Sequence, residues 1–268
     1  MTEPEATMYP DDSQREPYEQ AGSEVGGKHL VRLLKPITFK SEVGKTIDER
    51  IIAPQFYNCF NYSLLSQEQS NFNLTVGITS ANPGEGKTLV ASNLAVSLAI
   101  SNQRETVLVD LNIRNPRLHS IFGTKLGPGL VESLSESTIQ VAPTKVKHLY
   151  VLSAGNPVGS PIVADRIASA NTGAAGTAKR TSLGLEQLAA FRDVVYSLRQ
   201  AFEFVIIDMP SIQEPRVPIQ LTHQMDGLLV VVDAHRTKYG DIERTLERLN
   251  KNQILGFVLN HASHEDHR

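Results

Sequence analysis

The chain has 268 residues, of which 40% are hydrophobic and 21% charged, a composition typical of a globular protein rather than a disordered one. This length is sufficient for one large α/β domain with a hydrophobic core. The formal net charge of −3 excludes a general attraction to nucleic acid or to anionic lipid.

The sequence contains no evident export or membrane signal. The N-terminus lacks a basic stretch followed by an apolar one, and the apolar run GLLVVVDA is only as long as a strand. The single cysteine, Cys59, rules out a disulfide framework, fits a reducing cytoplasm and is best interpreted as an apolar filler. We therefore expect a cytoplasmic protein that associates with a membrane only through a partner.

The first 73 residues are predicted to precede the main domain. Residues 1–28 are rich in Glu, Asp, Pro, Ser and Gln, which predicts a disordered acidic leader, with a docking tail as the alternative. Residues 29–73 combine an extended stretch around Pro36 with Phe56, Phe60 and Leu64 at helical spacing, which predicts a helix before the first core strand.

Residues 74–260 alternate short apolar runs with helical stretches. The runs are LTVGIT, TVLVD, HLYVLSA, FEFVIID, GLLVVVDA and ILGFVLN, and the helical stretches are LVASNLAVSLAIS, LEQLAAFRDVVYSLRQAF and DIERTLERLNKN. This alternation predicts an α/β fold with a doubly wound, mostly parallel sheet and helices on both faces. Ligands are then expected at the carboxyl ends of the strands. Residues 167–184 are predicted to form a flexible insertion, with a mobile lid as the alternative, and residues 261–268 a polar tail.

The stretch SANPGEGKT, residues 80–88, has the pattern of a phosphate-binding loop. It follows a predicted strand and opens a predicted helix, the context in which this motif is credible. Glycines let successive backbone N–H groups turn toward phosphate oxygens, the lysine adds a cation, and the threonine hydroxyl can bind Mg²⁺. The nucleotide-binding residues expected here are Pro83, Gly84, Glu85, Gly86, Lys87, Thr88 and Leu89.

Two predicted strands end in an acid, Asp110 in TVLVD and Asp208 in FEFVIID. Either acid alone could simply cap the next turn. Because both follow apolar strands in a chain that has a phosphate loop, we expect them to position Mg²⁺ or water beside ATP.

These motifs together resemble the bacterial tyrosine kinases (BY-kinases) of capsule and exopolysaccharide assembly. The resemblance rests on SANPGEGKT, VLVDLNIRNPRLHSIFG and FVIIDMP, and it extends in the family's order over about residues 74–260. It implies a cytoplasmic Mg-ATP domain that works with a transmembrane polysaccharide co-polymerase and can form a homo-oligomer. The catalytic residues implied are Lys87, Asp110, Asp208 and Arg114, the Mg²⁺ ligands Thr88, Asp110, Asn112 and Asp208, and the adenine contact Asn260.

The chain departs from the family pattern in three places. Asn112 replaces the second acid of the D-x-D-x-R motif, and an amide cannot act as a base, which leaves that role to Asp110. The last tyrosine is Tyr239, without the tyrosine cluster that often ends these kinases, and a helix that often knits family rings is neutral at Gln55, Asn58 and Asn61. These departures point away from a ring-forming autokinase.

Three functions remain open at this stage. The first is phosphotransfer from Mg-ATP to protein tyrosine, with Tyr9 and Tyr18 as candidate substrates. The second is an ATP-gated module with little or no kinase activity that docks on a membrane partner. The third, a partition or septum-positioning ATPase, is disfavoured because the signature lysine of that class is replaced by Asn82. The tail contains His261, His264 and His267, which could form a metal site, but a polar terminus is the favoured interpretation.

Overall fold

The computed structural model describes residues 37–39, 73–101, 103–156, 186–214 and 219–262, all within one compact unit, Leu34–Arg268. The acidic leader, the helix expected around Phe56, the insertion at 167–184 and the last six residues of the tail lie outside the described residues. The predictions for those segments therefore remain predictions.

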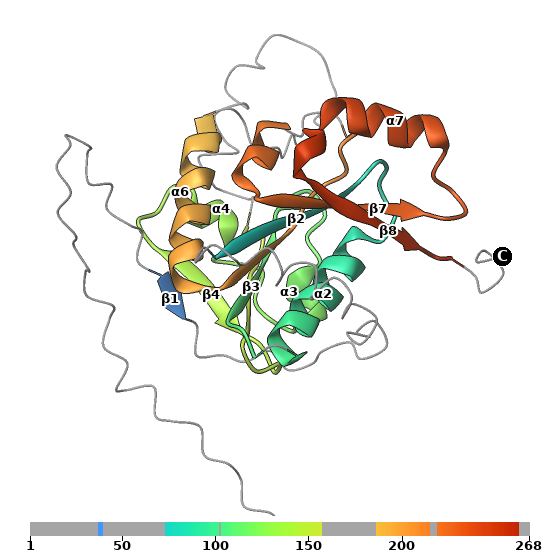
Figure 1. Cartoon of the computed structure of the whole chain (residues 1–268). Coiled ribbons are helices and arrows are strands. Elements are labelled where there is room, and N and C mark those ends of the chain that lie inside the picture. The colour runs from blue at the N-terminus through green and yellow to red at the C-terminus, as the bar shows by residue number, and fades with distance from the viewer. Residues whose placement is uncertain (1–36, 40–72, 102, 157–185, 215–218, 263–268) are drawn as a thin grey trace, which may run out of the picture. The chain divides into compact units, whose positions relative to one another are not determined.

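The core of the unit is an eight-stranded sheet in the order β1-β4-β5-β3-β6-β2-β7-β8 (Figure 1). The strands are β1 Ile37–Phe39, β2 Leu74–Ser80, β3 Thr106–Asp110, β4 Ile139–Pro143, β5 Leu149–Leu152, β6 Phe204–Asp208, β7 Gly227–Asp233 and β8 Ile254–Asn260. Every neighbouring pair is parallel except β4 and β5. The predicted mostly parallel sheet is therefore confirmed.

Helices cover both faces of the sheet. They are α2 Lys87–Ser101, α3 Leu118–Ile121, α4 Leu130–Ser133, α6 Glu186–Ala201 and α7 Tyr239–Arg248, with 3₁₀ turns η4 Ile219–Gln224 and η5 Lys251–Gln253. Alternate residues of β6 separate the two layers, because Val205 packs in the cluster that contains Phe191 of α6, whereas Ile206 packs with Leu94 of α2. Successive side chains of a strand point to opposite faces, so α6 and α2 lie on opposite sides of the sheet. The doubly wound prediction is confirmed.

The two main helices reflect their sequences. The α2 helix is rich in Ala, Ser, Val and Leu and is buried over most of its length, as expected for a helix without a polar face. The α6 helix buries Phe191, Val195 and Leu198, which recur at spacings of three and four, and leaves Tyr196 exposed. This arrangement matches the apolar face predicted from the sequence.

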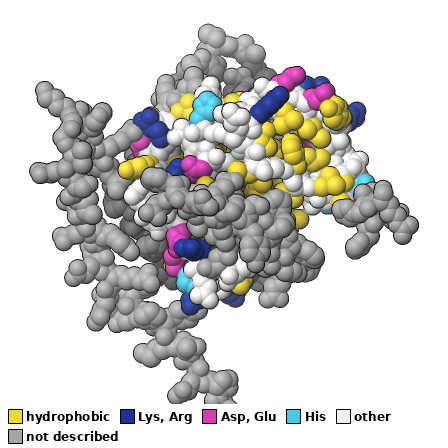
Figure 2. Space-filling model, viewed as in Figure 1, with side chains coloured by type: hydrophobic (Ala, Val, Ile, Leu, Met, Phe, Trp, Pro, Cys, Tyr) yellow, Lys and Arg dark blue, Asp and Glu magenta, His cyan; other side chains and the backbone are white. Residues whose placement is uncertain are grey.

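The far edge of the sheet is more open. Within the described residues β8 pairs with β7 alone, and Phe257 and Leu259 are 48% and 52% exposed. Figure 2 shows hydrophobic side chains gathered on this side of the molecule, beside α7. Central parallel strands are buried on both faces, and β8 departs from that rule because it has only one neighbour.

Several short elements escaped the sequence analysis. The strand β4 and the one-turn helices α3 and α4 are too short to show a clear apolar period, and the helix predicted over 241–252 ends at Arg248, before η5. None of the described helices combines the length and the hydropathy needed to cross a bilayer.

Candidate nucleotide site

The phosphate loop connects β2 to α2, and two of its glycines adopt positive φ angles. Gly84 has φ +82° and Gly86 φ +94°, conformations that L residues rarely adopt. A Cβ on Gly86 would lie 2.0 Å from Nδ2 of Asn260, so this position has neither the backbone freedom nor the space for another residue. The loop therefore has the left-handed turns that direct N–H groups into a concave anion site.

Lys87 begins α2 at the end of this loop and is only 6% exposed. Burial lowers the pKa of its ammonium group, and the carboxylates of Asp208, Glu214 and Glu85 oppose that shift. No ion pair joins Lys87 to any residue that the structure describes. The Lys87 ammonium is therefore buried at the loop and is available to bind an anion such as a phosphate group.

Thr88 and Asp208 meet at the carboxyl end of β6. The Thr88 hydroxyl donates to Oδ2 of Asp208 over 2.6 Å, while the buried Oδ1 has no hydrogen-bond partner within the described chain. Burial, together with the nearby Asp110 carboxylate, raises the pKa of Asp208 to about 7, although Thr88 and Lys87 act in the opposite direction. A buried carboxylate oxygen without a partner beside a hydroxyl is a donor set that fits Mg²⁺, which commonly uses one or two carboxylates together with phosphates and water.

Asp110 and Asp208 are register partners on the adjacent strands β3 and β6. Oδ1 of Asp110 accepts from the N–H of Asn112, and Oδ2 accepts from the N–H groups of Arg117 and Leu118 at the start of α3. Burial raises the pKa of Asp110 to about 6 against the effect of these three bonds. Asp110 therefore caps the following turn, the simpler of the two roles considered from sequence, while it also faces Asp208.

The other two residues of the D-x-D-x-R motif, Asn112 and Arg114, differ in their exposure. Asn112 is half-buried beside Asp110, whereas Arg114 is exposed, and no ion pair among the described residues joins Arg114 to either acid. The structure thus brings together Lys87, Thr88, Asp110 and Asp208, whereas the exposed Arg114 forms no ion pair with either acid.

Glu85 is a buried carboxylate in the middle of the loop, 3% exposed, and no local pattern predicts its partners. It accepts from the backbone N–H and the side-chain amide of Asn82 over 3.1 and 3.2 Å, and from the hydroxyl of Thr237 over 2.6 Å. The same amide of Asn82 donates to Asp241 of α7 over 3.1 Å. Asn82, at the position of the partition-ATPase lysine, is therefore engaged within its own chain.

Sequence reasoning also missed the acids that lie outside the strand-end pair. Glu214 follows β6 in an irregular loop, where no periodic signal marks it, yet its charge acts on Lys87. Asp233 ends β7 just as Asp110 ends β3, so the same strand-end pattern could have identified it.

Asn260 lies against the loop from the end of β8. Its amide donates to the carbonyl of Glu85 over 3.0 Å, so the residue expected at the adenine contacts the phosphate loop in this structure. The next residue, His261, contacts Asp233 through Nδ1 over 2.9 Å. Within the described residues no group of three or more His, Cys, Asp or Glu could hold a metal ion, and His264 and His267 lie outside them.

Several known proteins are similar to this chain in sequence. No protein-family model matches the chain. The tyrosine-protein kinase CpsD of Streptococcus pneumoniae serotype 4 is 27% identical over 78% of this chain and 84% of its own length. The succinoglycan biosynthesis transport protein ExoP of Rhizobium meliloti is 29% identical over 69% of this chain, which corresponds to 22% of ExoP.

A solved structure shares the fold. The kinase domain of VpsO superposes with a TM-score of 0.61 at 24% identity, covering 80% of this chain and 97% of that domain. The chain is thus similar, over most of its length, to tyrosine-protein kinases. It has the phosphate loop and both strand-end acids of the BY-kinase pattern, and it carries Asn112 where that pattern has a second acid.

Proposed function

We propose that this BY-kinase homologue binds Mg-ATP and transfers the γ-phosphate to protein tyrosine during exopolysaccharide or capsule synthesis. The observation that carries the proposal is the pairing of a glycine-turned phosphate loop with the Thr88–Asp208 pair, whose carboxylate has one buried oxygen without a partner in the described chain. The curated relatives that are tyrosine-protein kinases support the same reaction.

The residues of the site have distinct roles in this proposal. The N–H groups of the loop and the ammonium of Lys87 bind the phosphates, and Thr88 with Asp208 holds Mg²⁺. The metal, when bound, offsets charge on the β- and γ-phosphates. Asn260, whose amide donates to the carbonyl of Glu85, would contact the nucleotide. Arg114, being exposed, would act on a protein substrate rather than within the metal site.

Asp110 is the proposed general base. Its pKa of about 6 lies close to neutral pH, so the carboxylate is largely ionised there and still accepts a proton readily. The tyrosine hydroxyl would lose its proton to Asp110 while its oxygen bonds to the γ-phosphorus. The bond from that phosphorus to the bridging oxygen breaks, and ADP is released.

One observation favours the alternative of an ATP-gated module with weak kinase activity or none. Both oxygens of Asp110 already accept backbone N–H bonds, which makes the carboxylate a poorer base. In that case nucleotide binding would serve to dock the chain on a partner. The similarity to a segment of ExoP, a biosynthesis transport protein, supports a membrane polysaccharide co-polymerase as the partner in either case.

Mass spectrometry of the intact protein after incubation with Mg-ATP tests the proposal. Added phosphate that maps to tyrosine, and that is absent from Lys87→Met, would establish an autokinase. An unchanged mass on a sample that binds ATP by titration, and that also leaves a co-expressed co-polymerase unphosphorylated, would replace the kinase with the gated module. A sample that does not bind ATP would contradict both functions.

A further inference from the structure

The turn between β7 and α7, residues 233–238, is closed by its own hydrogen bonds. The carbonyl of Asp233 accepts from the N–H groups of Arg236 and Thr237 over 3.2 and 3.0 Å. The N–H of Asp233 in turn donates to the Thr237 hydroxyl over 2.9 Å, and Oδ1 of Asp233 accepts from the N–H of His235 over 3.0 Å. The backbone around Arg236 therefore has a defined conformation.

This turn is attached to the phosphate loop at two points. The Thr237 hydroxyl donates to the buried Glu85 carboxylate over 2.6 Å, and the Asn82 amide reaches Asp241, in the first turn of α7, over 3.1 Å. A hydrogen bond to a charged group is stronger than one between neutral groups. The turn and the loop are thus held together even though about 150 residues separate them in the sequence.

Arg236 is the residue that this arrangement brings to the loop. Its Nη1 lies 3.8 Å from the position that a Cβ on Gly84 would occupy, so the guanidinium lies beside the backbone of a phosphate-loop glycine. The side chain is exposed, and no salt bridge joins it to a described residue. Its hydrogen-bond donors remain available to a ligand in the loop.

The negative charge around the loop means that bound phosphates would benefit from a second cation. The carboxylates of Glu85, Asp208 and Glu214 all act on Lys87, so the single loop lysine is already surrounded by negative charge. Nucleotide phosphates would add several more negative charges. A guanidinium suits this role because its planar array of donors matches phosphate oxygens.

We propose that Arg236 is a phosphate-binding residue of the nucleotide site, and that Glu85, through Thr237, positions it. The inference rests on the proposed nucleotide binding and adds a second cation, supplied by the β7–α7 turn. It differs from the roles assigned above because Arg236 belongs neither to the phosphate loop nor to the D-x-D-x-R motif.

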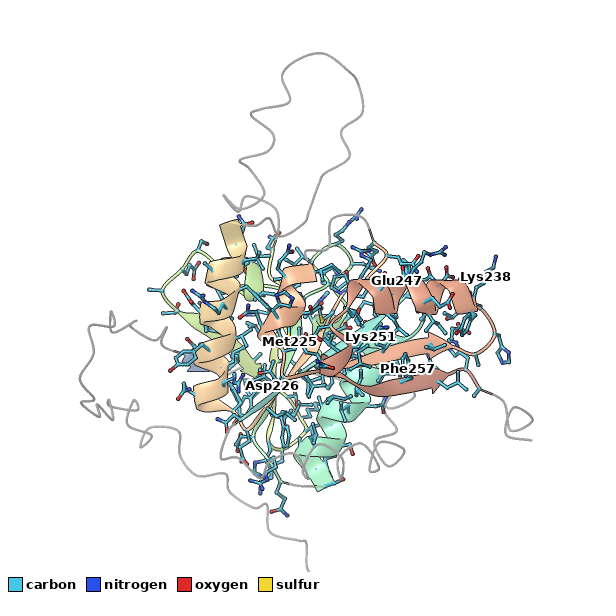
Figure 3. The ribbon with its side chains drawn as sticks, turned by 45° about the horizontal axis from the view of Figure 1, so that its top comes forward. Met225, Asp226, Lys238, Glu247, Lys251 and Phe257 are labelled. Atoms are coloured by element: carbon cyan, nitrogen blue, oxygen red, sulfur yellow. The ribbon has the colours of Figure 1, made fainter. Side chains whose placement is uncertain are left out.

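The chain provides a matched control for charge. Lys238 lies two residues further on, at the start of α7, and its side chain is exposed (Figure 3). No hydrogen bond or ion pair of this side chain occurs within the described residues. Arg236→Gln and Lys238→Gln remove the same charge from the same turn, and only the first removes a group beside Gly84.

The experiment is titration of Mg-ATP, Mg-ADP and adenosine into the full chain and its variants. Arg236→Gln should weaken Mg-ATP binding about tenfold, the loss expected for one charge-assisted contact. Adenosine binding should stay within about twofold, since adenosine has no phosphate, and Arg236→Lys should recover part of the loss. Thr237→Val, which preserves the side-chain shape and removes the bond to Glu85, should also weaken Mg-ATP binding.

The outcomes separate the two proposals. Equal Mg-ATP affinity for Arg236→Gln and Lys238→Gln, with the wild type binding normally, would overturn the role of Arg236 and leave the proposed function intact. An equal loss for ATP and adenosine would also overturn it, because the effect would not arise at the phosphates. A wild type that binds no nucleotide would overturn the proposed function and this inference with it.

Discussion

The hydroxyl of Thr88 donates a 2.6 Å hydrogen bond to Oδ2 of Asp208, and Oδ1 of that buried carboxylate has no partner among the described residues. Two residues 120 positions apart in the chain thus form one polar pair at the end of β6. The pair explains how a helix and a strand combine to create a candidate metal site, and it makes the metal dependence of nucleotide binding testable.

Thr88→Val should abolish most of the Mg²⁺-dependent gain in ATP affinity. Valine keeps the shape of threonine but has no hydroxyl to bind Mg²⁺. The loss of that hydroxyl should reduce the affinity for ATP in Mg²⁺ about tenfold. In EDTA the wild type and the variant should bind ATP within about twofold of each other, because the loop and Lys87 are unchanged. Isothermal titration in the two buffers measures this, and an equal loss in both would contradict the assignment of Thr88 to the metal.

The two buried acids should make the ligand-free protein less stable as the pH rises. Their pKa values are raised from 3.8 to about 6 for Asp110 and about 7 for Asp208, so between pH 4 and 7 the folded state binds more protons than the unfolded chain. The free energy of unfolding therefore falls over that window and levels off above it.

Thermal unfolding at pH 5 and pH 8 tests this linkage. We expect the Tm to fall by about 5 °C from pH 5 to pH 8, a shift equivalent to roughly 2 kcal/mol for a domain of this size. Asp208→Asn should show a smaller fall because its amide does not ionise, and Mg²⁺ should stabilise the wild type more at pH 8 than at pH 5. A Tm that rises equally in wild type and variant would show that other groups dominate.

Glu85→Ala should destabilise the fold as well as the loop. The substitution leaves the N–H of Asn82 and the hydroxyl of Thr237 without their acceptor, while the Asn82 amide keeps its bond to Asp241. An unsatisfied buried group costs about 1–3 kcal/mol, and less where it is only half-buried, as these are. Because water can reach part of this site in the variant, we expect a total loss of about 2–3 kcal/mol in the free energy of unfolding. Denaturant unfolding measures it, with the exposed Glu243→Ala of α7 as a control that should change stability by no more than about 0.5 kcal/mol.

Gly86→Ala should weaken nucleotide binding more than tenfold and destabilise the loop by about 1–3 kcal/mol. The new methyl group would meet the Asn260 amide at 2.0 Å, and φ +94° would be strained. The double variant Gly86→Ala, Asn260→Ala should recover only part of the loss, because it relieves the contact and not the backbone strain.

A second glycine serves as the control for that experiment. Gly240 in α7 has no atom within 4 Å of its Cβ position, so Gly240→Ala should raise the free energy of unfolding by about 0.5–1 kcal/mol. Nucleotide affinity should not change. Equal behaviour of the two alanine variants would contradict a specific requirement for glycine at position 86.

Local sequence patterns were sufficient to predict the mostly parallel sheet and the phosphate loop. Apolar runs such as TVLVD and FEFVIID, alternating with amphipathic helices, fix a parallel sheet because local periodicity decides which faces can be buried. The strand-end positions of Asp110 and Asp208 also placed both acids at the same edge of the sheet. These inferences succeeded because each depends on a few neighbouring residues.

The pairing of the site residues, by contrast, depends on the three-dimensional fold. The bonds from Thr237 to Glu85 and from Asn82 to Asp241, and the position of Arg236 beside Gly84, join segments about 150 residues apart, and no local pattern specifies such contacts. The structure also showed that Asp110 caps α3 while Asp208 retains a buried oxygen without a partner among the described residues. Asp110 and Asp208 both end an apolar strand, yet their hydrogen bonds and pKa values differ. The reason is that these properties of a carboxylate depend on which backbone N–H groups the fold brings to it.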